Sequence, residues 1–150
     1  MTYITDGGNT GLYGEGETSI QRLCSYIPYF ESIDPDIACR CSPPATLVDG
    51  SICLPGFTYD AEFMQFVEEF QKSCLVDYTY MQTIEQRTPD FPEVDIHEAI
   101  ETADLELMKA IMTRFVRAER FCDGAWDGAI RGGIFLAGLR RLRELSLTGQ

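Results

Sequence analysis

Histidine is nearly absent from this sequence, and tryptophan occurs once in its 150 residues. Because His97 is the only histidine, the chain has no second imidazole for the His-Glu-x-x-His motif of zinc proteases. Basic residues are also scarce, with 12 Lys and Arg against 24 Asp and Glu and a net charge of −12. So acidic a surface disfavours broad contact with a phosphate backbone, and we expect no direct nucleic-acid binding.

Long hydrophobic runs are missing as well. Arg, Asp or Glu interrupts every apolar stretch before it reaches the ~20 residues that a membrane-spanning helix needs. Residues 1–6 also lack the basic segment and apolar run of a secretory signal. We therefore expect a protein without membrane contact and with a cytoplasmic location.

Six cysteines occur in this chain, and free thiols are the expected state where no export signal is seen. Cys39, Cys41 and Cys53, with Cys24 upstream, could supply four thiolates to a structural zinc or form a disulfide. Their spacing differs from the paired Cys-x-x-Cys of zinc knuckles. We predict that the protein holds no metal and no other cofactor.

Apolar periodicity predicts a mainly helical protein. We expect a flexible Gly-rich arm at residues 1–16 and a single helical domain at residues 17–150, a compact bundle of about five to six helices. The expected helices begin at residue 18 or 19, after the capping residue Asp60, at Val94, at Leu105 and after Gly132-Gly133. The helix that begins at Leu105 is expected to run to Phe121.

Residues 34–56 show no helical periodicity. Asp34-Pro35-Asp36 is expected to end the preceding helix, and Pro43-Pro44, Asp49-Gly50 and Pro55-Gly56 mark successive turns. The sequence therefore predicts a long irregular loop, a length of connection that is often functional.

Charge is distributed unevenly along the chain. Residues 1–104 carry 19 Asp and Glu against 4 Lys and Arg, which is a net −15. Residues 105–150 carry 5 against 8, which is a net +3. The acidic part and the basic part each suggest a function.

A motif of the form Thr-x-x-Val-Arg-x-x-Arg-Phe-x-x-Gly spans residues 113–124. With this motif the chain resembles a family of small uncharacterised bacterial proteins, to which it is also similar near residues 26–30 and 66–70. The family commonly has Asp-Trp after its Phe-rich helix, where this chain has Asp77-Tyr78. The resemblance implies a helical fold and a phage or mobile-element origin, and it implies no activity.

The first functional hypothesis is a non-catalytic acidic protein that binds a basic protein partner. An acidic surface can occupy a positively charged channel, and electrostatic steering speeds that association. A CRISPR or other defence nuclease is such a partner, and the protein would then be an anti-CRISPR-like inhibitor. The candidate partner-binding residues are Asp60, Glu62, Glu68 and Glu69. The alternative is an acidic face that only favours solubility.

The second hypothesis is a module that binds a nucleotide or another phosphorylated small molecule. Arginines at three-residue spacing on one helix can present planar donors to a phosphate group. The candidate ligand-binding residues are Arg114, Arg117, Arg120 and Arg131. The alternative is that these arginines pair with the protein's own abundant carboxylates.

No catalytic constellation stands out. No serine is flanked by the glycines of a nucleophile elbow, and Cys122 with His97 is the weakest form of a nucleophile and base signal. We therefore expect no enzymatic activity. The sequence leaves the oligomeric state open.

Overall fold

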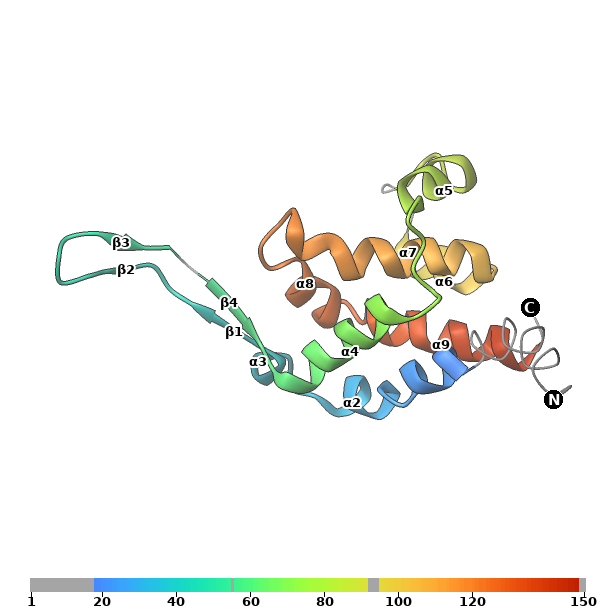
Figure 1. Cartoon of the computed structure of the whole chain (residues 1–150), viewed down its shortest axis with the longest axis horizontal. Coiled ribbons are helices and arrows are strands. Elements are labelled where there is room, and N and C mark those ends of the chain that lie inside the picture. Colours follow the sequence, from blue (N-terminus) through green and yellow to red (C-terminus); the bar gives the residue numbers. More distant parts are fainter. Residues whose placement is uncertain (1–17, 55, 92–94, 149–150) are drawn as a thin grey trace, which may run out of the picture.

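The computed structural model describes residues 18–54, 56–91 and 95–148, and the Gly-rich arm predicted at residues 1–16 lies outside them. Helices form one body, from which a long β-hairpin projects (Figure 1). The mainly helical fold is confirmed. In the part of the chain that the structure describes, no helix is long and apolar enough to cross a membrane.

The helical body consists of short elements. Residues 18–24 are helical and precede a turn at residues 25–26. The further helical elements are α2 (Ile27–Ser32), α3 (Pro35–Ala38), α4 (Ala61–Lys72), α5 (Tyr80–Arg87), α6 (Ile96–Thr102), α7 (Leu105–Arg117), the 3₁₀ turn η1 (Ala118–Arg120), α8 (Ala125–Arg131) and α9 (Ile134–Leu147).

Aspartate side chains begin four of these helices by accepting a hydrogen bond from a backbone N–H of the first turn. Asp60 accepts from Phe63 at 2.8 Å, so the predicted cap of α4 is confirmed. Asp34 accepts from the backbone N–H of Asp36 at 2.9 Å and begins α3. The preceding helix α2 ends at Ser32, as predicted for this Asp-Pro-Asp segment, and the same segment also begins a new helix.

The core is an aromatic cluster shared by α2, α4 and α9. Phe63, Phe66 and Phe70 form a stripe along α4, and all three are fully buried. Phe135 of α9 lies 5.6 Å from Phe63 and 5.5 Å from Phe66 between ring centroids. The ring of Phe30 stacks on Phe135 at 5.8 Å and adds α2 to the cluster.

Both faces of α7 are covered. Its apolar face, with Met108 and Met112, packs on α9, where Gly138 allows the close approach of Met112. Its second face carries α5, whose Tyr80 and Ile84 form a small separate cluster with Ala110. Arg114 and Arg117, which follow Ala110 along this face, are therefore partly buried.

The helix α7 ends at Arg117, four residues before the predicted end at Phe121. The indole Nε1 of Trp126 donates to the backbone carbonyl oxygens of Phe115 at 3.1 Å and Val116 at 3.0 Å. The last carbonyl groups of a helix have no hydrogen-bond donor within the helix, and here the indole supplies one. The chain turns through η1 and enters α8.

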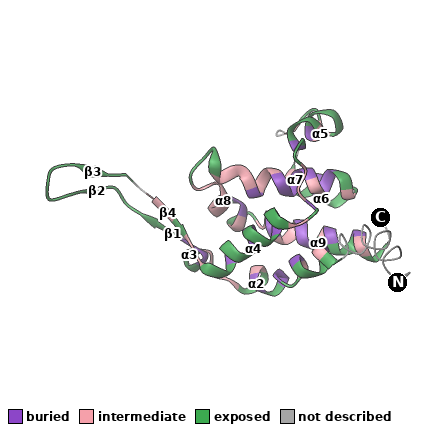
Figure 2. Ribbon diagram, in the orientation of Figure 1, coloured by how far each residue is buried: buried purple, intermediate pink, exposed green. Residues whose placement is uncertain are grey.

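The long connection at residues 34–56 was predicted to be irregular, but it contains α3 and a β-hairpin. Strand β1 (Cys39–Ser42) pairs antiparallel with β4 (Gly56–Tyr59), and β2 (Ala45–Thr46) pairs with β3 (Ile52–Cys53). At the turn Gly50 has a φ of +88°, which glycine tolerates best. Figure 2 shows that the outer half of this hairpin is exposed.

Candidate functional site

Two arginines near the end of α7 lie beside aromatic residues of α5 and of the segment that follows it. Arg114 and Arg117 are partly buried and Arg120 is exposed. The guanidinium carbon of Arg114 lies 4.8 Å from the centroid of the Phe91 ring. That of Arg117 lies 5.9 Å from the Tyr80 ring. Aromatic rings thus hold two of the guanidinium groups by cation–π contact.

Arg117 and Arg120 share a hollow of about 190 Å³, which we call the arginine hollow. Its lining residues are Phe70, Gln71, Val76, Tyr78, Thr113, Val116, Arg117 and Arg120. Thr113 is held in place because its Oγ1 donates to the Lys109 carbonyl at 2.7 Å and accepts from the Asp77 N–H at 3.0 Å. The hollow therefore offers two cationic groups beside a fixed polar floor.

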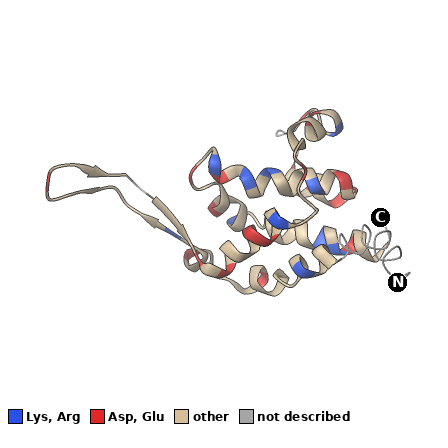
Figure 3. Ribbon diagram, viewed as in Figure 1, with Lys and Arg blue, Asp and Glu red and all other residues tan. Residues whose placement is uncertain are grey.

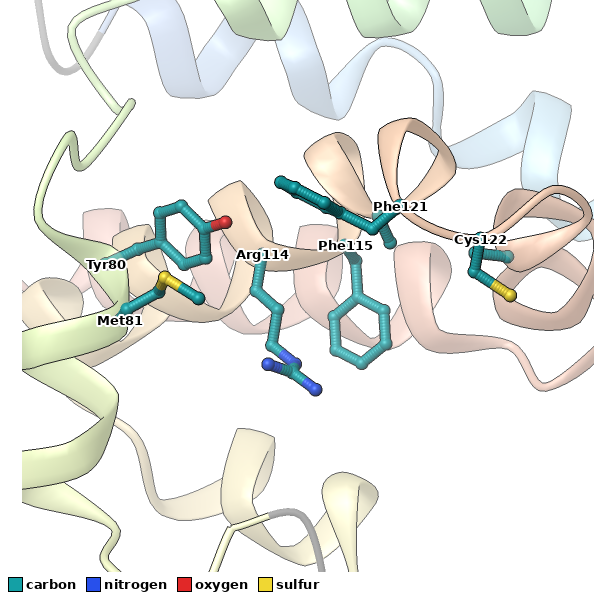
Figure 4. Close-up of a pocket in the computed structure, with 8 residues that line it drawn as sticks. Tyr80, Met81, Arg114, Phe115, Phe121 and Cys122 are labelled. Atoms are coloured by element: carbon teal, nitrogen blue, oxygen red, sulfur yellow. The ribbon is translucent and has the colours of Figure 1, made fainter.

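Arg114 lines a different hollow, a groove of about 460 Å³ that we call the apolar groove (Figure 4). Its lining residues are Tyr80, Met81, Arg114, Phe115, Ala118, Phe121, Cys122 and Ala125. Tyr80 and Met81 enter it from α5, and Phe121 and Cys122 come from the segment that follows η1. Among the described residues, Arg114 is the single charged residue in this lining.

The ion pairs of the described residues do not include Arg114, Arg117 or Arg120. The Nε atom of Arg117 is buried and has no hydrogen-bond partner among those residues. The alternative in which these three arginines pair with the protein's own carboxylates is thus not what the described part of the chain shows.

Arg131, the fourth predicted ligand residue, lies elsewhere. Its guanidinium group pairs with Asp127 of the same helix at 2.9 Å and with Asp36 at 2.7 Å, and the Asp36 contact links α3 to α8. The predicted set of four arginines is therefore divided over three places. Sequence spacing could not reveal this division, because it depends on where α5 packs on α7.

The acidic residues of the first hypothesis also differ in their surroundings. Besides capping α4, Asp60 accepts a hydrogen bond from the Tyr29 hydroxyl at 2.9 Å. Burial and this hydrogen bond raise the pKa of Tyr29. Glu68 pairs with Lys72 at 2.6 Å. Glu62 and Glu69 are exposed on α4 and form no ion pair within residues 18–54, 56–91 and 95–148.

The family match covers nearly the whole chain. A family of unknown function, DUF6508, matches residues 16–148. The chain belongs to the DUF6508 family. No curated protein and no solved structure matches it. Membership of an uncharacterised family is thereby confirmed, and the DUF6508 match names no ligand or partner.

In this DUF6508 chain, sequence reasoning missed the contacts made by Glu119, because they join residues from distant parts of the chain. Its Oε1 accepts from the Tyr59 hydroxyl at 3.0 Å and from the backbone N–H of Trp126 at 2.9 Å. Its Oε2 accepts from the Gly124 N–H at 2.9 Å. Gly124 has a φ of +88°, and a Cβ there would lie 2.7 Å from the Phe57 ring. This network fixes the base of the hairpin to the end of α7.

The cysteines and the histidine occupy separate places. All six cysteines are free thiols, and Cys39 is buried at the base of the hairpin, where burial raises its pKa. His97 contacts the Gly132 carbonyl at 2.8 Å through Nε2, whereas Cys122 lines the apolar groove. In the described ranges, no three His, Cys, Asp or Glu side chains gather as metal ligands. That the purified protein carries no metal stays a prediction.

Proposed function

We propose that the arginine hollow binds a small phosphorylated molecule through Arg117 and Arg120. The observation that carries this proposal is the pair of guanidinium groups beside one hollow, neither of which contacts a carboxylate among the described residues. The protein has twice as many acidic as basic residues, so local carboxylates were available. An anion in the hollow would supply the missing negative charge.

The surroundings favour a nucleotide over a bare anion. Arginine donors fit phosphate oxygens in a planar, bidentate geometry. Tyr78 lines the same hollow and its side chain is 83% exposed, so its ring is free to stack on a base. Gln71 adds an amide that can donate to or accept from the ligand.

The test is titration calorimetry of the protein with AMP and, separately, with inorganic phosphate. Because hydrogen bonds to charged groups contribute about 1.5–3 kcal/mol, we expect Arg117→Gln and Arg120→Gln each to weaken AMP binding at least tenfold. Arg131→Gln is the matched control and should leave AMP binding unchanged, since its guanidinium is held by Asp36 and Asp127.

Two results would count against this function. One is the absence of measurable heat with either AMP or phosphate at millimolar concentration. The other is AMP affinity that survives in the doubly substituted Arg117→Gln, Arg120→Gln protein. Melting curves of each variant show whether a loss of binding reflects the site or a loss of fold.

A second candidate function is supported by Glu62 and Glu69. These carboxylates are exposed on α4, and no described cation pairs with them. We propose that they contact a basic protein partner such as a CRISPR or other defence nuclease, in the manner of an anti-CRISPR inhibitor. Association between such surfaces is steered by charge and weakens as salt rises.

Charge reversal tests this second function in a nuclease inhibition assay. Glu62→Lys with Glu69→Lys should abolish inhibition, because two repulsive contacts replace two attractive ones. Glu98→Lys with Glu101→Lys, the same change on exposed positions of α6, is the matched control and should inhibit as before. Equal inhibition by both variants, or none by the unaltered protein, would reject this candidate.

A further inference from the structure

The outer end of the hairpin is an apolar surface with a single charge. Residues 47–54 form the hairpin tip, and its exposed apolar side chains are Leu47, Val48, Ile52 and Leu54. Asp49 is the only charged residue of the tip. Figure 3 shows how few charged positions the hairpin carries compared with the helical body. Isolated two-stranded hairpins are marginally stable in water, so this surface is suited to a contact that covers it.

The apolar groove has the complementary composition. Its walls include Met81 and Phe121, whose side chains are 64% and 74% exposed. Its single charge is Arg114, which forms no ion pair within the described part of the chain. A protruding apolar tip with one carboxylate therefore matches a concave apolar groove with one guanidinium group.

We propose that the hairpin tip of one copy docks into the apolar groove of a second copy, with Asp49 beside Arg114. The hairpin projects away from the body, so its tip does not cover the groove of its own chain (Figure 1). Asp49 Oδ1 accepts from the Ser51 N–H at 2.9 Å and from its hydroxyl at 2.6 Å, and these hydrogen bonds lower the pKa of Asp49. The tip therefore presents an ionised carboxylate.

Net charge explains why a projecting hairpin suits self-association. Two bodies of an acidic protein repel each other, with −12 on each chain. A strand advances ~3.3 Å per residue, so the hairpin residues 39–48 extend over at most about 30 Å. The Debye length at physiological ionic strength is ~8 Å. Contact through the tip can therefore hold most of the two acidic surfaces farther apart than this length, where salt screens their repulsion.

The contact joins unlike surfaces, so it can form a reciprocal dimer, a closed ring or an open chain of copies. Analytical ultracentrifugation at about 5–500 µM should show mass rising above the 16.9 kDa of one chain. Asp49→Arg and Arg114→Asp should each weaken association at least tenfold, because like charges then meet. The doubly substituted protein should regain association, because the charges are exchanged.

Arg120→Asp is the matched control, since Arg120 lines the other hollow, and it should associate like the unaltered protein. If the Arg114→Asp variant unfolds, Val48→Asp replaces it as the test. Val48 is fully exposed, so this substitution should reduce association without loss of fold. A constant monomer mass for the unaltered protein would overturn the proposal. So would a double charge exchange that associates no better than its single variants. Since Arg117 and Arg120 do not line this groove, failure here leaves AMP binding untouched.

Discussion

Replacing Phe135 by alanine should remove about 3–5 kcal/mol from the free energy of unfolding. Phe135 is fully buried, and its ring lies within 6 Å of the rings of Phe30, Phe63 and Phe66. The cavity left by the lost ring would open where α2, α4 and α9 meet. Since domains are stable by about 5–15 kcal/mol, this loss is a large fraction of the total.

The measurement is urea unfolding followed by circular dichroism, with the slope and midpoint fitted separately. Phe121→Ala is the matched control, because the Phe121 side chain is 74% exposed. It should change the free energy of unfolding by no more than about 0.5 kcal/mol. If the two substitutions destabilise equally, the aromatic cluster is not the core that we describe.

Those parts of the fold that depend on local pattern were predictable. The stripe of Phe63, Phe66 and Phe70 is set by helical periodicity, and the cap at Asp60 by the preference of aspartate for that position. Both features need only neighbouring residues along the chain. The cap and the buried face of α4 in the structure therefore agree with what local sequence rules predict.

The hairpin was missed for a physical reason. Its two ladders are short and are separated by Pro43-Pro44 on one strand, so neither strand shows a sustained alternation of apolar and polar residues. Turn residues alone indicated a loop. Cys39 pairs with Tyr59, which lies far from it in sequence. The pairing depends on the tertiary positions of α3, which precedes β1, and α4, which follows β4.

The candidate site was predictable by residue type but not by grouping. Helical spacing places Arg114 and Arg117 on one side of α7, and the structure agrees. That Tyr80 of α5 packs between their two hollows is a tertiary contact, and no local rule indicates it. The same holds for Arg131, which pairs with an aspartate of distant α3.

Replacing Glu119 by alanine should destabilise the protein by about 2–4 kcal/mol and loosen the base of the hairpin. The substitution removes the acceptor for three donors at once, namely the Tyr59 hydroxyl and the N–H groups of Gly124 and Trp126. Burial and the hydrogen bond to Glu119 raise the pKa of Tyr59, so the phenol stays protonated and needs an acceptor. Asp123→Ala, at an exposed neighbouring position, is the matched control and should have little effect.

Amide hydrogen exchange distinguishes local loosening from global destabilisation. Exchange in the β1 and β4 ladder should quicken more in Glu119→Ala than exchange in α4, because the lost contacts hold β4 to the start of α8. Tyr59→Phe, Glu119→Ala and their combination form a double-mutant cycle, and a coupling of about 0.5–3 kcal/mol is expected for groups in one network. Additive effects in that cycle, with uniform exchange across β4 and α4, would show that Glu119 does not anchor the hairpin. If coupling is found, the position of the hairpin tip depends on a carboxylate at its base.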